Sequence, residues 1–246
     1  MEQAPGANKM ARLILINGLK RTGKTTAADT LAGWIKKSIR LNFADHLKTM
    51  THAVYGPPSD PNYFESVKDQ PLAEFGGASP RNAYIYMSEY VVKPRHGDQF
   101  FGAIYLRKSQ DLIKEYGYAE NEAVLISGDV GFASETIPPL MHYGTENAIL
   151  IRMHRAGAST DGDSRGHFWP QDIANSSAKY NSNHHKIEHP YTPGSNFSDQ
   201  PPLFDADVTN INGQMTAAAA RILDLYNALS NGAEWSHGVD QNVGPQ

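Results

Sequence analysis

The stretch "RLILINGLKRTGKTTAADTLAGWI", residues 12–35, decides the fold of this chain. Residues 12–17 contain the continuous aliphatic run 13–16, with two β-branched isoleucines, which is typical of a strand that is buried on both faces. A loop framed by two glycines follows, and residues 25–37 then carry helical spacing. The stretch therefore predicts one strand–loop–helix unit of an α/β domain.

The loop of this unit carries a phosphate-binding motif. Gly18, Gly23, Lys24 and Thr25 match every fixed position of G-x-x-x-x-G-K-[ST], the Walker A pattern. The glycines let backbone N–H groups turn inward around a phosphate, and the helix that begins here directs its positive end toward the same anion. Lys24 can reach the β- and γ-phosphates, and the Thr25 hydroxyl can bind Mg²⁺. We therefore expect ATP to bind along Gly18, Leu19, Lys20, Arg21, Thr22, Gly23, Lys24, Thr25 and Thr26, with Lys24 as a catalytic cation.

Apolar strands and helical segments alternate over the remaining chain. Strands are expected over 38–43, 122–129, 147–155 and 206–213, and helices over 44–56, 80–92, 99–116 and 214–230. The alternation predicts a three-layer α/β sandwich, in which helices cover both faces of a central parallel sheet.

The domain organisation follows from composition and periodicity. We expect a disordered lead-in over 1–10, one domain over 11–230 and a flexible tail over 231–246. Residues 156–206 are rich in Gly, Ser, Asn, His and Pro and show little periodicity, so they are expected to form long loops that act as a lid or hold substrate.

Amino-acid composition limits the classes of protein to which the chain can belong. The 246 residues are 40% hydrophobic and 20% charged, which suits one globular domain. No run approaches the length of a membrane span, so no membrane partner is expected and a cytoplasmic location is the simplest interpretation. Cysteine is absent, which excludes a disulfide scaffold, a thiol nucleophile and Cys-ligated zinc.

Charge is distributed unevenly along the chain. Residues 1–50 hold nine basic and three acidic residues, a net +6, whereas residues 201–246 hold one Arg and five acids, a net −4. A basic end around the glycine loop fits a locally bound polyanion, although the asymmetry can also be incidental. The formal net charge of −4 does not resemble the strongly basic face of a protein that relies on contacts to a nucleic-acid backbone.

Asp129 is the second candidate for the phosphate chemistry. It ends the apolar segment "VLISGD", and ligands of open α/β sheets collect at the carboxyl ends of strands. Its carboxylate is expected to hold Mg²⁺ or the waters of that ion, as a Walker-B residue does. The alternative is that Asp129 caps the helix that follows.

Three arginines are candidates for neutralising the charge of a transferred phosphate. Arg152 and Arg155 follow the "AILI" strand, where P-loop kinases commonly carry lid arginines, and solvated surface positions are the alternative. Arg81 stands in the first turn of the 80–92 helix, where the helix dipole opposes a cation, and this favours a ligand role.

Asp45 has two interpretations of equal weight. It follows the second strand in "NFADHLK", where a carboxylate could accept the proton of a hydroxyl acceptor. It could equally cap the helix that carries Leu47 and Lys48.

Histidines and aromatic residues give weaker signals. His184, His185 and His189 cluster in "NHHKIEHP", but this segment reads as a loop without a fourth ligand, so a metal site is not favoured. Several aromatic residues could stack on a base, although core packing is the more ordinary role for most of them. They are Phe100, Phe101, Tyr105, Phe168 and Trp169.

The motifs occur in an order that resembles a known family. "NGLKRTGKTTAADTL", "FADHLK", "SPR…SE", "ISGD…E" and "RMHR" follow one another as in the bacteriophage deoxynucleoside monophosphate kinases, which are P-loop kinases, and the resemblance covers about 12–230. It implies an ATP- and Mg²⁺-dependent kinase, located in the host cytoplasm if phage-encoded, with Arg152 and Arg155 in the lid. It also implies that Asp45, Lys48, Arg81, Glu89 and Lys93 face the acceptor.

One departure from the family bears on the acceptor. Gly131 stands in "GDVGFASE" where the family commonly has an arginine that can hold a substrate phosphate. The segment "SPRNAYIYMSEYVVKPRHGDQFFG" also resembles a branch that phosphorylates the hydroxymethyl group of 5-hydroxymethyluracil in phage DNA, during thymine hypermodification. Three hypotheses follow: a kinase acting on such DNA, a kinase acting on a free dNMP, and a P-loop NTPase that is not a kinase. The oligomeric state stays open.

Overall fold

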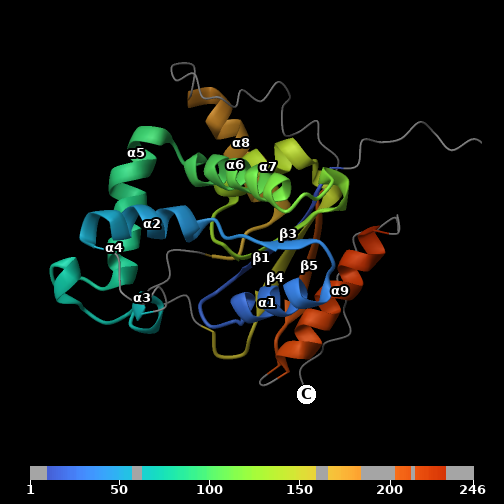
Figure 1. Ribbon diagram of the computed structural model, residues 1–246, viewed down its shortest axis with the longest axis horizontal. Coiled ribbons are helices and arrows are strands. Elements are labelled where there is room, and N and C mark those ends of the chain that lie inside the picture. Colours follow the sequence, from blue (N-terminus) through green and yellow to red (C-terminus); the bar gives the residue numbers. More distant parts are fainter. Residues whose placement is uncertain (1–9, 57–62, 159–165, 184–202, 212–213, 231–246) are drawn as a thin grey trace, which may run out of the picture.

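A computed structural model describes residues 10–56, 63–158, 166–183, 203–211 and 214–230. Its five strands form one parallel sheet in the order β2-β3-β1-β4-β5 (Figure 1). The strands are β1 Arg12–Gly18, β2 Ser38–Arg40, β3 Val124–Val130, β4 Ala148–His154 and β5 Phe204–Thr209. The predicted parallel sheet is thus confirmed, and the glycine loop leaves its central strand.

Helices cover both faces of this sheet, as predicted. One face carries α1 Lys24–Trp34 and α9 Met215–Ser230, and the other carries α6 Phe100–Glu115, α7 Ala133–Tyr143 and α8 Pro170–Asn183 (Figure 1). Leu13 and Leu15 of β1 pack into the core on the α6–α7 side, whereas Ile14 and Ile16 pack into the core on the α1–α9 side. Because both faces are covered, the strand reads as an unbroken apolar run.

A group of short helices lies beside the sheet and is inserted between β2 and β3 (Figure 1). It has a small core of its own around Phe64, Phe75 and Ala83, and a second cluster of Met87 and Val92 joins it to α6. We call this group the side unit. Its elements are α2 Ala44–Tyr55, α3 Tyr63–Ser66, η1 Ala73–Phe75, α4 Pro80–Tyr86, η2 Met87–Val92 and α5 Lys93–His96. Two more short 3₁₀ helices, η3 Glu120–Glu122 and η4 Thr145–Asn147, precede β3 and β4.

The helix predicted over 80–92 begins as expected but ends later. Ser79 caps it by accepting a hydrogen bond from the Asn82 backbone N–H at 3.2 Å, with Pro80 in the first turn. The helix continues to His96 through the π-helical segment η2. Pro94 explains the π segment, because a proline lacks an N–H and its ring clashes with the carbonyl four residues earlier. The Lys93 N–H accordingly bonds to Ser88 O, five residues back.

The expectation of loops throughout 156–206 is wrong for part of the segment, because α8 runs over Pro170–Asn183. Its sequence is rich in Ser and Asn, which are weak helix formers, so periodicity is faint. Local start signals are nevertheless present: Pro170 opens the helix, and Asp172 accepts a hydrogen bond from the Trp169 N–H at 2.7 Å. Ile173 then anchors the helix in the core.

Several expectations lie outside the described residues. They are most of the lead-in, the tail over 231–246, and the cluster of His184, His185 and His189. Within the described part of the chain, no helix combines the length and apolar character that crossing a bilayer requires.

Candidate active site

A cavity of about 560 Å³ lies at the carboxyl ends of β1 and β3. It is lined by the glycine loop, the start of α2, the helix formed by α4 and η2, and the start of α7. The connection from β1 enters α1 on one face of the sheet, and the connection from β3 enters α7 on the other. The two loops therefore diverge at this point, which is where open α/β sheets bind ligands.

The backbone of the glycine loop adopts conformations that require glycine. Gly18 has φ 151° and Gly23 has φ 94°, and Arg21 also has a positive φ of 64°. A Cβ on Gly18 would lie 2.6 Å from Met153 O, and one on Gly23 would lie 2.6 Å from Met215 Sδ. Both glycines are therefore fixed by conformation and by close packing.

Hydrogen bonds hold the loop in its curved form. Lys24 Nζ donates to Leu19 O at 2.6 Å and so spans the loop, and Thr22 Oγ1 donates to the same carbonyl at 2.9 Å. Asn210, just after β5, donates to Thr22 O at 2.9 Å. The first N–H groups of α1 have no intrahelical partner, so the loop and helix start form a cradle suited to an anion. Lys24 and Thr25 both line the cavity.

Asp129 faces the same cavity and connects two parts of the site. Its carboxylate oxygens accept hydrogen bonds from the N–H groups of Phe43, at 3.0 Å, and Ala44, at 2.9 Å, where α2 begins. Asp129 thus caps α2, and not the helix that follows it in the chain. Burial raises the pKa of this carboxyl, while the two backbone hydrogen bonds oppose that rise. Thr25 and Asp129 are the two oxygen-bearing residues, one from each loop, that could hold Mg²⁺ with its waters.

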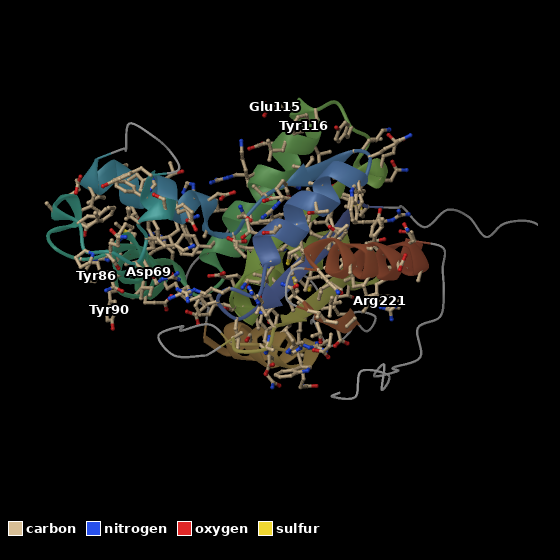
Figure 2. The ribbon with its side chains drawn as sticks, turned by 90° about the horizontal axis from the view of Figure 1, so that it is seen from below. Asp69, Tyr86, Tyr90, Glu115, Tyr116 and Arg221 are labelled. Atoms are coloured by element: carbon tan, nitrogen blue, oxygen red, sulfur yellow. The ribbon has the colours of Figure 1, made fainter. Side chains whose placement is uncertain are left out.

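Arg81, in the first turn of α4, lines the cavity from the side unit. Its Nε donates to Asp69 Oδ1 at 2.6 Å, and Lys20 Nζ of the glycine loop lies 3.6 Å from the same oxygen. The hydrogen bond from Arg81 holds the pKa of Asp69 below its usual range. Asp69, labelled in Figure 2, therefore connects the glycine loop to the side unit.

Two lysines of the side unit share one carboxylate. Lys48 Nζ lies 3.2 Å from Glu65 Oε2, and Lys68 bonds to the other oxygen of the same group. All three side chains line the cavity. Lys48 thus lines the cavity, and it shares with Lys68 the single negative charge of Glu65, which sequence reasoning did not identify.

The innermost charged cluster consists of Glu89, Lys93 and Glu135. Lys93 is only 7% exposed, and its Nζ lies 2.8 Å from Glu89 Oε1 and 3.4 Å from Glu135 Oε1. The same ammonium stands 3.7 Å from the ring centroid of Phe132, a cation–π contact. Burial raises the pKa of Glu135 to about 7, although the charge of Lys93 opposes the rise.

Arg152 and Arg155 are placed differently from the predicted lid. Arg152 is buried, and its guanidinium pairs with Asp205 at 2.5 Å and with Asp207 at 2.9 Å, both on the neighbouring strand β5. It is not among the residues that line the cavity. Arg155 contacts the glycine loop instead, because its Nη1 donates to Arg21 O at 3.1 Å.

Asp45 is exposed and is not among the cavity-lining residues. Its Oδ2 accepts a hydrogen bond from the Asn42 N–H at 3.0 Å, just ahead of α2. This geometry favours the helix-capping interpretation over the role of a base.

The aromatic candidates separate into two groups. Phe101 lines the cavity. Tyr105 stacks on Phe43 in the core, with ring centroids 4.1 Å apart, and Phe168 is also buried. Among the described residues, no group of three or more His, Asp or Glu side chains is arranged to hold a metal ion by itself.

Sequence reasoning missed Asp69, Asn210 and the role of Glu135. Asp69 and Asn210 lie in irregular segments without periodicity, so nothing in the chain marks them. Glu135 offered one signal, because an acid in the first turn of a helix directly after a strand end faces the ligand edge of the sheet.

Comparisons with known proteins give loose similarities only. Neither a scan against protein-family models nor a search of curated proteins finds a match. The chain is similar to a thymidylate kinase structure from Candida albicans, with 12% identity, a TM-score of 0.38, and 94% of this chain and 96% of that chain covered. It is also similar to a gluconokinase structure from Sinorhizobium meliloti 1021, with 12% identity, a TM-score of 0.34, and 93% and 100% covered. The α/β fold class rests on the sheet order and helix layers described above.

Proposed function

We propose that this chain is a P-loop phosphotransferase that passes the γ-phosphate of ATP to an acceptor bound in the same cavity. The glycine loop supports a donor role, because its glycines are conformationally required and Lys24 stands at the cavity wall. In this arrangement Lys24 and the backbone N–H groups would neutralise the β- and γ-phosphates, and Thr25 and Asp129 would hold Mg²⁺, which would supply further positive charge. Phosphoryl transfer needs little beyond such positioning and charge neutralisation.

The proposed acceptor is the hydroxymethyl group of 5-hydroxymethyluracil in DNA. The observation that carries this choice is the charge of the acceptor side of the cavity. Outside the glycine loop, three cations line it, Lys48, Lys68 and Arg81, against five carboxylates, Glu65, Asp69, Glu89, Asp129 and Glu135. Lys93 is not in the lining but pairs with Glu89 and Glu135, and with it the formal balance is 4 − 5 = −1. A monophosphate brings between one and two further negative charges, whereas a hydroxymethyl group brings none.

Two further features suit a base in this position. Leu47, Tyr84, Phe101 and Phe132 line the cavity and offer apolar and aromatic surface to a planar ring. Gly131, also in the lining, supplies no cation at the position where the resembling family commonly has one. A base inside duplex DNA would have to be flipped out of the stack to enter such a cavity.

A free dNMP is the second candidate acceptor. Arg81 favours it, because a phosphate that enters the cavity could take this guanidinium from Asp69. The order of the sequence motifs also matches the monophosphate kinases. The argument against a dNMP is that its phosphate would have to break ion pairs that the site already makes in its absence.

Transfer of label from [γ-³²P]ATP with Mg²⁺ tests the proposal directly. Oligonucleotides with and without 5-hydroxymethyluracil, and each of the four dNMPs, are offered in parallel. Label is expected only in the hydroxymethylated oligonucleotide. Label in dNMPs alone would establish the second candidate, and release of free phosphate with no labelled acceptor would indicate an NTPase that is not a kinase.

A further inference from the structure

One buried carboxylate of the cavity lies outside the glycine loop and is not one of the two residues proposed to hold Mg²⁺. Glu135 is 6% exposed, lies in the first turn of α7 and lines the same cavity as Lys24. Its position is tightly fixed, because α6 approaches α7 so closely that a Cβ on Gly102 would overlap the carbonyl of residue 135. A buried acid without an enclosing set of hydrogen bonds is costly to keep, so its presence calls for a reason.

Charged groups on three other elements act on Glu135. Lys93 of α5 lies 3.4 Å from it, and Glu89 of η2 shares that lysine. Asp129 of β3 adds a negative charge that raises the pKa of Glu135, while Lys93 lowers it. Burial is the largest effect and brings the pKa to about 7, a value suited to a group that accepts and releases a proton at neutral pH.

The other carboxylates around the inner cavity are more fully engaged. Both oxygens of Asp129 accept backbone N–H groups. Glu89 Oε1 accepts from Ser88 Oγ at 2.9 Å and from Lys93 Nζ at 2.8 Å. The contact of Glu135 with Lys93 is longer, and Asp45 is exposed and outside the cavity lining.

We propose that Glu135 is the general base of the transfer, and that Lys93 is the positioning residue that keeps it ionised. This inference rests on the proposed function, because only a hydroxyl acceptor needs a base. The Glu135 carboxylate takes the proton of the acceptor O–H as that oxygen forms a bond to the γ-phosphorus. The bond from the γ-phosphorus to the oxygen that bridges it to the β-phosphate breaks, and ADP leaves with that electron pair.

The test compares Glu135→Gln with the unaltered protein, using the hydroxymethylated oligonucleotide as acceptor. The amide keeps the shape of the side chain but cannot accept the proton, so kcat is expected to fall about 10²- to 10⁴-fold. ATP affinity, measured by equilibrium binding, should stay the same. Glu115→Gln is the matched control, because Glu115 is exposed at the end of α6, on the outside of the molecule (Figure 2). Its activity should not change.

The pH profile separates a base from a residue that merely supports the fold. The rate of the unaltered protein should rise with pH around 7, and that rise should be missing in Glu135→Gln. Lys93→Met should move the rise to higher pH, because the lysine charge no longer favours the ionised carboxylate. Glu135→Asp should recover part of the activity, and thermal unfolding of each variant checks that it is folded.

The outcomes are distinguishable. Full activity of Glu135→Gln with the oligonucleotide, or a pH rise that survives in this variant, would overturn the base while leaving the kinase intact. Label in dNMPs alone would also overturn the base, because a phosphate acceptor needs none. Absence of transfer by the unaltered protein to every acceptor would overturn the proposed function and the base together.

Discussion

The proposed donor and acceptor sides of the cavity are built in different ways. On the donor side, glycine conformations and backbone N–H groups form the cradle, and Lys24 and Lys20 come from the same loop. On the acceptor side, the walls consist of ion pairs between residues distant in the chain, such as Glu135 and Lys93. A triphosphate can be held by a local motif, whereas selection of the acceptor depends on charges that only the tertiary fold brings together.

Removal of Lys24 is the strongest challenge to the donor side. Lys24→Ala deletes the cation expected at the β- and γ-phosphates, and transfer to any acceptor should fall at least about 10²- to 10³-fold. The measurement is the rate of label transfer under saturating acceptor. Lys36→Ala is the control, because Lys36 is exposed just beyond the end of α1. Equal activity of the two variants would remove the basis for a P-loop donor site.

Titration of Glu135, on the acceptor side, should make the stability of the protein depend on pH. The folded pKa of Glu135 is about 7 against an ordinary 4.5, so its protonated form is favoured by folding. The stabilisation is complete below pH 4.5 and is lost as the pH rises through 7, a change of roughly 3 kcal/mol at most. The free energy of unfolding of Glu135→Gln, relative to the unaltered protein, should therefore increase from about pH 4.5 to about pH 8. Urea unfolding measures this difference. If it is the same at pH 4.5 and at pH 8, the raised pKa of Glu135 is contradicted.

A pair of glycine substitutions tests how tightly α6 holds α7 and with it Glu135. A Cβ on Gly102 would overlap the carbonyl of Glu135, so Gly102→Ala should destabilise the protein by about 1–3 kcal/mol. Gly33 in α1 has nothing within 4 Å of such a Cβ, and Gly33→Ala should stabilise by about 0.5–1 kcal/mol. Urea unfolding measures both, and equal effects would mean that the close approach of the two helices is unimportant.

The smallest expected effect concerns acceptor selection. Asp69→Asn removes the carboxylate that engages Arg81 and Lys20, and so leaves two cations with less of their charge balanced. Binding of a dNMP should tighten, by up to about fivefold, since partly exposed pairs contribute about 1 kcal/mol or less. Equilibrium binding of dTMP measures this, with Asp111→Asn on the exposed side of α6 as control. Weaker binding in Asp69→Asn would contradict this expectation and would indicate that the Asp69 carboxylate helps to hold the nucleotide.

The contrast between a local loop and a wall built by tertiary contacts also explains which features can be predicted from the sequence. The glycine loop can be predicted in detail, because Gly18 and Gly23 are dictated by the backbone and by spacing alone. The apolar runs likewise predict a parallel sheet, but the central place of β1 depends on pairing with β3 and β4. Asp69 cannot be found from the sequence, because its role arises only when the side unit brings it between Lys20 and Arg81.

Two candidate catalytic residues are held elsewhere for the same physical reason. The end of a strand predicts a lid position for Arg152, but aspartates on β5 pair with it and keep it in the sheet. The sequence allows Asp45 to be either a base or a helix cap, and the hydrogen bond that it accepts from the Asn42 N–H favours the cap. In both cases the residue type and position are suitable for catalysis, and a partner from the fold decides otherwise.

The central claim is that a triphosphate on the glycine loop is passed to a neutral hydroxyl on the acceptor side. The most direct test is the location of the new phosphate. An oligonucleotide containing 5-hydroxymethyluracil and the four free dNMPs are incubated together with the protein, ATP and Mg²⁺, and the oligonucleotide is then digested to mononucleotides by a nuclease and analysed by mass spectrometry, with Lys24→Ala in parallel. We expect a phosphate on the hydroxymethyl oxygen of the base, and it should be absent with Lys24→Ala. An unmodified base, together with conversion of free dNMP to dNDP in the same mixture, would contradict it.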